Sequence, residues 1–179
     1  MSLTNNSLHP LGEPYHRQMT SFRRTRSAIL EATKNLIAIH GSQVTSMIEI
    51  ADAAEVSRAT LYNHFRSKES VLRALLDFEI ERILELAQAE ESPTQALARI
   101  SMEISTDPAL TTMRTYDPAF LTQLLSAGAD PLWQKCQQGL VQLLRSTQTV
   151  ELALRWLIGQ IFAPLTPEQS TYQARVITA

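Results

Sequence analysis

The sequence predicts an all-α fold, built from a small N-terminal three-helix head and a larger C-terminal helical domain. Apolar residues recur at spacings of three and four along most of the chain, and no alternating run of β-branched residues suggests a strand. Five Ser, Thr or Asp residues stand directly before a proline, which is typical of helix starts. A chain of 179 residues is also long enough to bury a core without disulfides.

Residues 1–19 are predicted to form a flexible arm, because they are polar and include Pro10 and Pro14. The first helix is expected over residues 20–40, with Gly41 as its C-terminal stop. Its apolar face is expected to consist of four residues at helical spacing: Ile29, Ala32, Leu36 and Ile39.

Residues 45–76 predict two short helices followed by a long one. Ser46 and Glu49 have the spacing of a capping box, which starts a short helix that ends near residue 54. Ser57 is expected to cap the second short helix, over residues 57–65, and Ser67 the long helix, which continues to about residue 90. This arrangement is that of a helix-turn-helix, so residues 20–66 are predicted to form the head.

The remaining helix starts follow from the cap-proline pairs. These pairs are Ser92-Pro93, Asp107-Pro108, Asp117-Pro118, Asp130-Pro131 and Thr166-Pro167. They predict helices over residues 92–106, 107–115, 117–127 and 130–146, and one from 166 onward. A further helix over 149–164 is apolar around most of its circumference and must be buried. Residues 67–179 are therefore assigned to one helical domain.

The second short helix has a polar outer face. Leu61 and Phe65 fall on its inner face. The outward residues are Ala59, Thr60, Asn63 and Arg66, with Arg58 and Tyr62 at the edge. Short polar side chains suit contacts with base edges, and the basic and hydroxyl groups around them suit contacts with phosphates. The same pattern therefore predicts a DNA-binding surface.

The motif in this stretch strongly resembles the signature of the TetR family of regulators. It consists of Ile50-Ala51, Ala54-x-Val56-Ser57, and Thr60-Leu61-Tyr62-x-x-Phe65-x-x-Lys68-Glu69-x-x-Leu72. The resemblance implies that Thr45, Ser46, Tyr62 and Lys68 hold phosphates and that Arg58, Ala59, Thr60 and Asn63 face bases, and His64 is placed in the same DNA-binding set. It also implies a homodimeric transcriptional regulator, a repressor that a small-molecule effector releases from its operator.

The chain departs from the family pattern at Glu55 and Ala59, where glycine is common. If Glu55 keeps a positive φ, the strain is about 1 kcal/mol. Arg23, Arg24 and Arg26 are either a solvated helix start or a phosphate or minor-groove contact.

The C-terminal domain is predicted to dimerise and to bind the effector. Helices 130–146 and 149–164 would pair with their copies in a four-helix bundle. The expected anchors of this dimer are Trp133, Leu140, Leu144, Trp156 and Ile161. Helices between residues 92 and 127 are expected to enclose a pocket for a largely apolar effector. Its expected lining is Met102, Arg114, Tyr116 and Phe120, although such residues equally well fill a core.

Composition narrows the alternatives. The first 70 residues carry eight Lys and Arg against six Asp and Glu, and the rest eight against twelve, so only the head is basic. An architectural DNA binder would need far more positive charge. The single cysteine, Cys136, excludes an internal disulfide and fits the cytoplasm. No metal, cofactor or catalytic motif is recognised, but a small helical enzyme or ligand-binding bundle without DNA binding is the alternative hypothesis.

Overall fold

A computed structural model of the chain describes residues 13–126 and 131–179. Within these ranges there are ten helices and no strand, which confirms the all-α prediction. The helices are α1 (Glu13–His40), α2 (Met47–Ala53), α3 (Arg58–His64), α4 (Lys68–Gln88), α5 (Pro93–Thr106), α6 (Pro108–Tyr116), α7 (Pro118–Ser126), α8 (Pro131–Leu144), α9 (Thr147–Phe162) and α10 (Pro167–Thr178).

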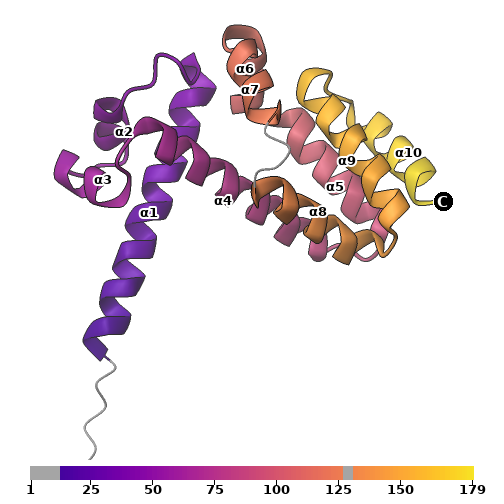
Figure 1. Ribbon diagram of the computed structural model, residues 1–179, viewed down its shortest axis with the longest axis horizontal. Helices are drawn as coiled ribbons and strands as arrows, with labels where there is room; N and C mark the ends of the chain where they lie inside the picture. The colour runs from indigo at the N-terminus through magenta and orange to yellow at the C-terminus, as the bar shows by residue number, and fades with distance from the viewer. Residues whose placement is uncertain (1–12, 127–130) are drawn as a thin grey trace, which may run out of the picture.

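The helices form two groups joined by α4. Figure 1 shows α1, α2 and α3 at one end of the molecule, with α4 running from them toward α8. At the other end α5 packs against α4, α9 and α10, while α8 packs against α4 and α9. Helix α6 packs against α1, so α6 and α7 lie between the two groups. We call α1–α3 the head and α5 with α8–α10 the body.

Most of the predicted helix starts are confirmed. Ser46 and Glu49 form the capping box of α2. The side chains that accept a backbone N–H at the first turns of α3, α4, α5, α6 and α10 are those of Ser57, Ser67, Ser92, Asp107 and Thr166, as expected. Glu55 adopts φ 55°, so the turn between α2 and α3 keeps the conformation that usually takes glycine. The expected cap at Asp130 lies outside the described residues.

The first helix differs from the prediction in its start and its buried face. It begins at Glu13 rather than near residue 20, because Pro14 in the first turn costs no hydrogen bond. Ile39, expected in the core, is 74% exposed, whereas Ile37 is buried. The buried face is rotated because Thr33 belongs to it, where its hydroxyl donates to the Ile29 carbonyl at 2.7 Å. Because threonine counts as polar in a hydrophobicity pattern, the sequence did not place Thr33 on the buried face.

Buried apolar side chains form two separate cores. The head core unites residues of α1–α3 with the start of α4 and with α6 and α7: Ile29, Leu30, Ile37, Ile50, Ala51, Leu61, Phe65, Val71, Leu75, Ala109, Met113 and Leu121. The body core comes from the end of α4, α5, α8, α9 and α10: Ala87, Ala96, Leu97, Ala98, Ile100, Leu140, Leu144, Val150, Ala153, Leu157 and Ala174. Helix α4 therefore contributes to both cores, the head core with its start and the body core with its end.

Candidate nucleic-acid interface and ligand cavity

Helix α3 presents the polar surface that the sequence predicts. Leu61 is fully buried and anchors the helix on the head core. The opposite face leaves Arg58, Ala59 and Asn63 exposed, and Tyr62 is 52% exposed. A helix held by its apolar side with short polar groups outward has the form that enters a major groove.

Two predicted contact residues are partly engaged in caps. The hydroxyls of Thr60 and Ser57 lie 2.8 Å apart, and the Ser57 hydroxyl also accepts the Thr60 N–H. Ser46 accepts the Glu49 N–H at 3.3 Å at the start of α2. The Thr60 and Ser46 side chains are half-buried, and each lies at a helix N-terminus, where phosphates are favoured.

Thr45 is the clear exception among the predicted phosphate contacts. Its side chain is only 1% exposed, and its hydroxyl donates to the Gly41 carbonyl at 2.8 Å. This bond fixes the loop between α1 and α2 from inside. The Thr45 side chain is therefore structural, because it is neither exposed nor free to contact a phosphate.

His64 ties α3 to α1. Its ring stacks on Phe22 with ring centroids 4.1 Å apart, and it is half-buried. Burial lowers the pKa of His64, and the nearby Arg26 lowers it further. The imidazole is therefore neutral at pH 7, and its place in the DNA-binding set does not rest on positive charge. Arg26 itself lies over the Phe65 ring, 5.5 Å from the centroid.

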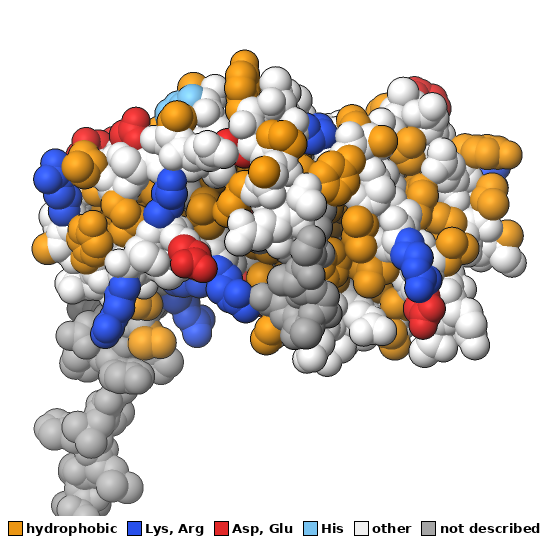
Figure 2. Space-filling model, turned by 45° about the horizontal axis from the view of Figure 1, so that its top comes forward, with side chains coloured by type: hydrophobic (Ala, Val, Ile, Leu, Met, Phe, Trp, Pro, Cys, Tyr) orange, Lys and Arg blue, Asp and Glu red, His pale blue; other side chains and the backbone are white. Residues whose placement is uncertain are grey.

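Basic side chains surround this face of the head. Arg23 and Arg24 are exposed on α1, one to two turns before the buried part of the helix. Figure 2 shows Lys and Arg side chains gathered over the head, at the left of the view. This distribution agrees with the basic head that the sequence predicts.

The loop between α1 and α2 is held from two sides. From α4, the Lys68 ammonium donates to the carbonyls of Ser42 and Gln43 at 3.1 and 3.0 Å. From the α6–α7 junction, the buried Asp117 carboxylate accepts the N–H groups of Ser42 and Gln43 at 2.5 and 3.2 Å, and the Ser42 hydroxyl at 2.8 Å. We call Asp117 and Lys68, with residues 42 and 43 between them, the loop clamp.

The loop clamp corrects one prediction. Asp117 was expected to cap the helix that begins at Pro118, but the hydrogen bonds of its side chain go to residues 42 and 43. Lys68, expected to hold a phosphate, uses two of its three donors on the loop, so the predicted phosphate contact stays a prediction. Gly41 is required here, since it has φ 90° and a Cβ would lie 2.9 Å from Asp117 Oδ2. Contacts between residues 75 positions apart leave no local sequence signal.

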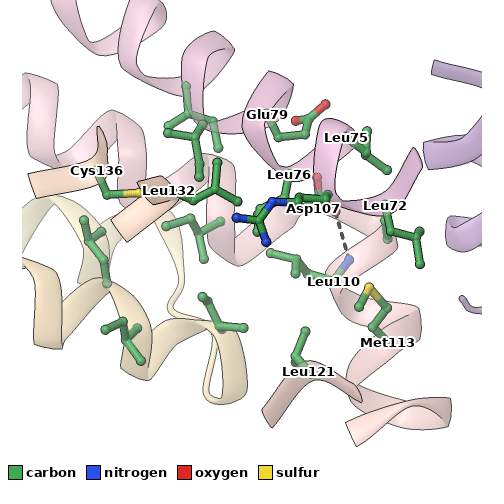
Figure 3. A pocket seen from close by; sticks show the side chains of 18 of the residues that line it. Leu72, Leu75, Leu76, Glu79, Asp107, Leu110, Met113, Leu121, Leu132 and Cys136 are labelled. Atoms are coloured by element: carbon green, nitrogen blue, oxygen red, sulfur yellow. Dashed lines mark hydrogen bonds between the residues drawn. The ribbon is translucent and has the colours of Figure 1, made fainter. Parts of the chain in front are cut away.

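A cavity of about 510 Å³ lies between the two cores. Its walls include head-core residues such as Leu75, Met113 and Leu121 and body-core residues such as Ile100 and Leu157. Figure 3 shows side chains from several helices converging on it. The aliphatic lining that sequence analysis missed includes Leu72, Leu76, Ile80, Ile83, Leu84, Ile104, Leu110, Leu132, Leu154 and Ile158.

Of the predicted effector-pocket residues, only Phe120 lines the cavity. Met102 packs against the body core. The Arg114 guanidinium donates to the Ile161 carbonyl at 3.1 Å and to Thr111 at 2.7 Å. Tyr116 is 68% exposed. Met102, Arg114 and Tyr116 therefore lie outside the lining of this cavity, most of which comes from α4, α8 and α9.

The predicted dimer anchors point into their own subunit. Leu140 and Leu144 belong to the body core, and Trp133, Leu140 and Ile161 line the cavity. The Trp156 indole donates to the Gln173 side chain at 2.6 Å. The apolar residues that α8 and α9 leave exposed are instead Val141, Leu152 and Phe162. A helix that is apolar on most sides can bury one face against its own chain and another against a partner chain. Helical periodicity in the sequence does not show which face is which.

One edge of the cavity carries charged groups that pair with one another. Lys34 of α1 lies 2.7 Å from Glu79 and 2.8 Å from Asp107. Arg82 lies 3.0 Å from Glu79 and 2.9 Å from Glu103. Burial alone lowers the pKa of Lys34, but its hydrogen bonds to Asp107 and Glu79 outweigh burial and raise it. These ion pairs link α1, α4 and α5 around the cavity.

Cys136 also lines the cavity, where burial raises the pKa of its thiol to about 11. A thiol protonated at neutral pH is a weak nucleophile, in agreement with a packing role. Within residues 13–126 and 131–179, no group of three His, Cys, Asp or Glu side chains is arranged to hold a metal ion. In the same ranges no helix has the length and apolarity needed to cross a membrane.

Residues 29–75 match the family of bacterial regulatory proteins called the tetR family. Over these residues the chain is similar to the TetR family. The match covers the head and the first part of α4, where the motif residues lie. The exposed polar face of α3 lies within this matched segment.

Known regulators resemble part of the chain. The HTH-type transcriptional repressor KstR2 of Mycolicibacterium smegmatis is 32% identical over 81 residues, which is 43% of this chain and 40% of KstR2. The HTH-type transcriptional regulator TtgR of Pseudomonas putida is 37% identical over 70 residues, which is 39% of this chain and 33% of TtgR. The chain thus matches less than half the length of these relatives.

Solved structures of TetR-type regulators share the whole fold. The repressor AlkX from Dietzia sp. strain DQ12-45-1b, implicated in biodegradation of n-alkanes, has a TM-score of 0.62 at 20% identity, covering 86% of this chain and 92% of AlkX. AibR, crystallised with isovaleryl coenzyme A and operator DNA, has a TM-score of 0.53 at 22% identity, covering 83% of this chain and 95% of AibR. At these identities the likeness shows the fold.

Proposed function

We propose that this chain is a sequence-specific DNA-binding transcriptional regulator of the TetR family, a repressor that a small-molecule effector releases from its operator. The observation that carries the proposal is the exposed polar face of α3 within the matched segment, residues 29–75. The proposal includes no catalysis, in line with the regulators that the head resembles, and it places the protein in the cytoplasm with the chromosome.

The DNA-binding part is tested by selecting genomic fragments that the purified protein retains. Tyr62→Phe should weaken binding to selected and random duplexes alike, because a phosphate contact carries no sequence information. Asn63→Ala should cost about 1–3 kcal/mol on the selected duplex and little on random DNA. If no fragment is enriched, or if both variants lose affinity equally on both duplexes, the assignment of α3 to base contacts is wrong.

The dimer is proposed to form through the outer faces of α8 and α9. Leu152, Gly159 and Phe162 follow one another at helical spacing on α9, and Gly159 has open space where a Cβ would point. Two heads so joined would face half-sites about 34–36 Å apart. Leu152→Glu should convert a dimer into a monomer in sedimentation experiments, whereas Gln88→Glu, exposed on α4 and outside the proposed interface, should not. A wild-type monomer would contradict this part.

Effector control is proposed to run through the loop clamp. Met113 of α6 and Phe120 and Leu121 of α7 line the cavity, and Asp117 lies between them in the chain. A ligand that displaces these helices would move the carboxylate that holds residues 42 and 43, and with it the start of α2. For a tenfold release, the ligand must favour the displaced state by about 1.4 kcal/mol.

A further inference from the structure

We propose that α1 makes a second DNA contact, in which Arg23 binds a phosphate beside the groove that α3 enters and the stack of Phe22 on His64 holds it there. The inference deepens the proposed DNA binding and rests on it. It is drawn from two contacts between α1 and the end of α3, and from the directions in which the arginines of α1 point.

Two contacts hold α1 beside the end of α3. The Phe22 ring stacks on His64, the last residue of α3, with centroids 4.1 Å apart and an interplanar angle of 28°. One turn further along α1, the Arg26 guanidinium lies 5.5 Å from the ring centroid of Phe65, the C-cap of α3. Phe22 is 48% exposed, so its ring is held at the surface rather than in the head core. Figure 1 shows α1 continuing past α3, beyond the other helices of the head.

These contacts place α1 next to the exposed polar face of α3. Asn63 and His64 are neighbours on α3, about 100° apart around the helix, so α1 lies beside the face that carries Asn63 and not behind it. An α-helix with its side chains is about 10–12 Å across, and the major groove is about 12 Å wide. Because α3 would fill the groove, a helix beside it must lie over the sugar–phosphate backbone.

The arginines of α1 point in different directions. At about 100° per residue, the side that faces α3 carries Phe22 and Arg26, while Arg23 lies roughly a quarter turn from it. Arg24 lies on the opposite side of the helix. Both Arg23 and Arg24 are exposed. Residues 14–30 include four arginines and no acidic residue, so no carboxylate of this stretch neutralises them. Arg23 can therefore offer its N–H groups to a phosphate beside α3, whereas Arg24 faces away.

The test compares these two neighbouring arginines on the duplex selected by the wild-type protein. Arg23→Ala should weaken binding at least about fivefold at about 0.1 M salt, and should reduce the slope of log K against log salt by about 0.9 for each bound head. Arg24→Ala removes the same charge from the opposite side of α1 and should cost less than about twofold. Phosphate ethylation interference should disappear at flanking phosphates in Arg23→Ala only.

The stack is tested by shape, because burial, with the nearby Arg26, lowers the pKa of His64 and leaves its ring neutral at pH 7. Phe22→Ala and His64→Ala should each lower the affinity and the salt slope, as Arg23→Ala does. His64→Phe keeps a ring to stack on Phe22 and should restore both. Combining Phe22→Ala with Arg23→Ala should cost no more than the larger single loss, because both act on one contact. Circular dichroism verifies the fold of each variant.

Equal losses for Arg23→Ala and Arg24→Ala, or an unchanged salt slope in Arg23→Ala, would overturn the inference. Additive losses for Phe22→Ala and Arg23→Ala, or a His64→Phe variant as weak as His64→Ala, would overturn the positioning by the stack. In each of these outcomes the wild-type protein still binds its duplex, so the proposed function stands. A wild-type protein that selects no duplex would overturn both.

Discussion

The head core and the body core are held together in different ways. In the body, a buried polar network joins α5, α9 and α10: the Ser101 hydroxyl lies 2.6 Å from Gln160 Oε1 and 2.7 Å from Ser170 Oγ, and Ser105 donates to Gln160 at 3.1 Å. Satisfied buried networks of this kind fix one packing arrangement. The head is joined to α6 and α7 by apolar contacts and by one buried carboxylate, that of Asp117. The body is thus interlocked by a buried network of uncharged side chains, whereas the head is held by apolar contacts, by the buried Asp117 carboxylate and by the ion pairs of Lys34.

The substitution Asp117→Ala tests whether the Asp117 carboxylate holds the head. It leaves the buried N–H of Ser42 without its acceptor and removes a charged hydrogen-bond partner, so the free energy of unfolding should fall by about 3–4 kcal/mol. Hydrogen exchange should speed up first in residues 29–75 and later in the body. Asp52→Ala, an exposed acidic residue of α2, is the control and should change little. Equal loss of protection in both cores would mean that the head is not held by this carboxylate.

The converse variant is Gln160→Ala. It removes the acceptor that Gln160 offers to the Ser105 hydroxyl, leaves Ser101 with Ser170 alone and opens a small cavity, so unfolding in urea should show a loss of about 3 kcal/mol. Here exchange should speed up in α5, α9 and α10, with the head retained. Gln138→Ala, exposed on α8, should be neutral. A neutral Gln160→Ala would show that the network does not stabilise the body.

The reactivity of Cys136 reports on the solvent access of the cavity between the two cores. With a pKa of about 11 against an ordinary value of 9.0, its thiolate fraction at pH 8 is about 100-fold below that of an ordinary thiol. Alkylation by iodoacetamide at pH 8 should be slower than that of free cysteine by a comparable factor and should accelerate as the pH rises toward 11. Rapid reaction at pH 8 would mean that this wall of the cavity opens to solvent.

The smallest expected effect lies within the head. Glu55→Gly relieves the positive φ between α2 and α3 and should raise the free energy of unfolding by up to about 1 kcal/mol, less the part offset by the flexibility of glycine in the unfolded chain. Asp52→Gly, in the neighbouring helix, should have the opposite sign. A destabilised Glu55→Gly variant would show that Glu55 makes a contribution beyond its backbone conformation.

The helices of the head could be predicted from the sequence because their signals are local. Ser46 with Glu49, Ser57 and Ser67 lie within three residues of the groups they cap, and the outward face of α3 follows from helical spacing. Asp117 was assigned to the wrong partner because its true partners lie 75 and 74 positions away. The directions in which the expected dimer and pocket residues point were hard to predict for a related reason. An apolar residue such as Leu140 or Ile161 gives the same sequence signal whether its side chain faces a core, a cavity or a partner chain. Only the packing of the whole chain decides which of these it faces.

The most direct test of the account fills the cavity without a ligand. Ile80→Phe adds a ring to the α4 wall of the cavity, and Glu85→Phe adds the same ring to an exposed position of α4. Binding to the duplex selected by the wild-type protein is measured by fluorescence anisotropy, with circular dichroism to verify the fold. The account predicts that Ile80→Phe weakens binding by at least about tenfold, as an effector would, while Glu85→Phe leaves it unchanged. A folded Ile80→Phe variant that binds this duplex as tightly as the wild-type protein would contradict the account.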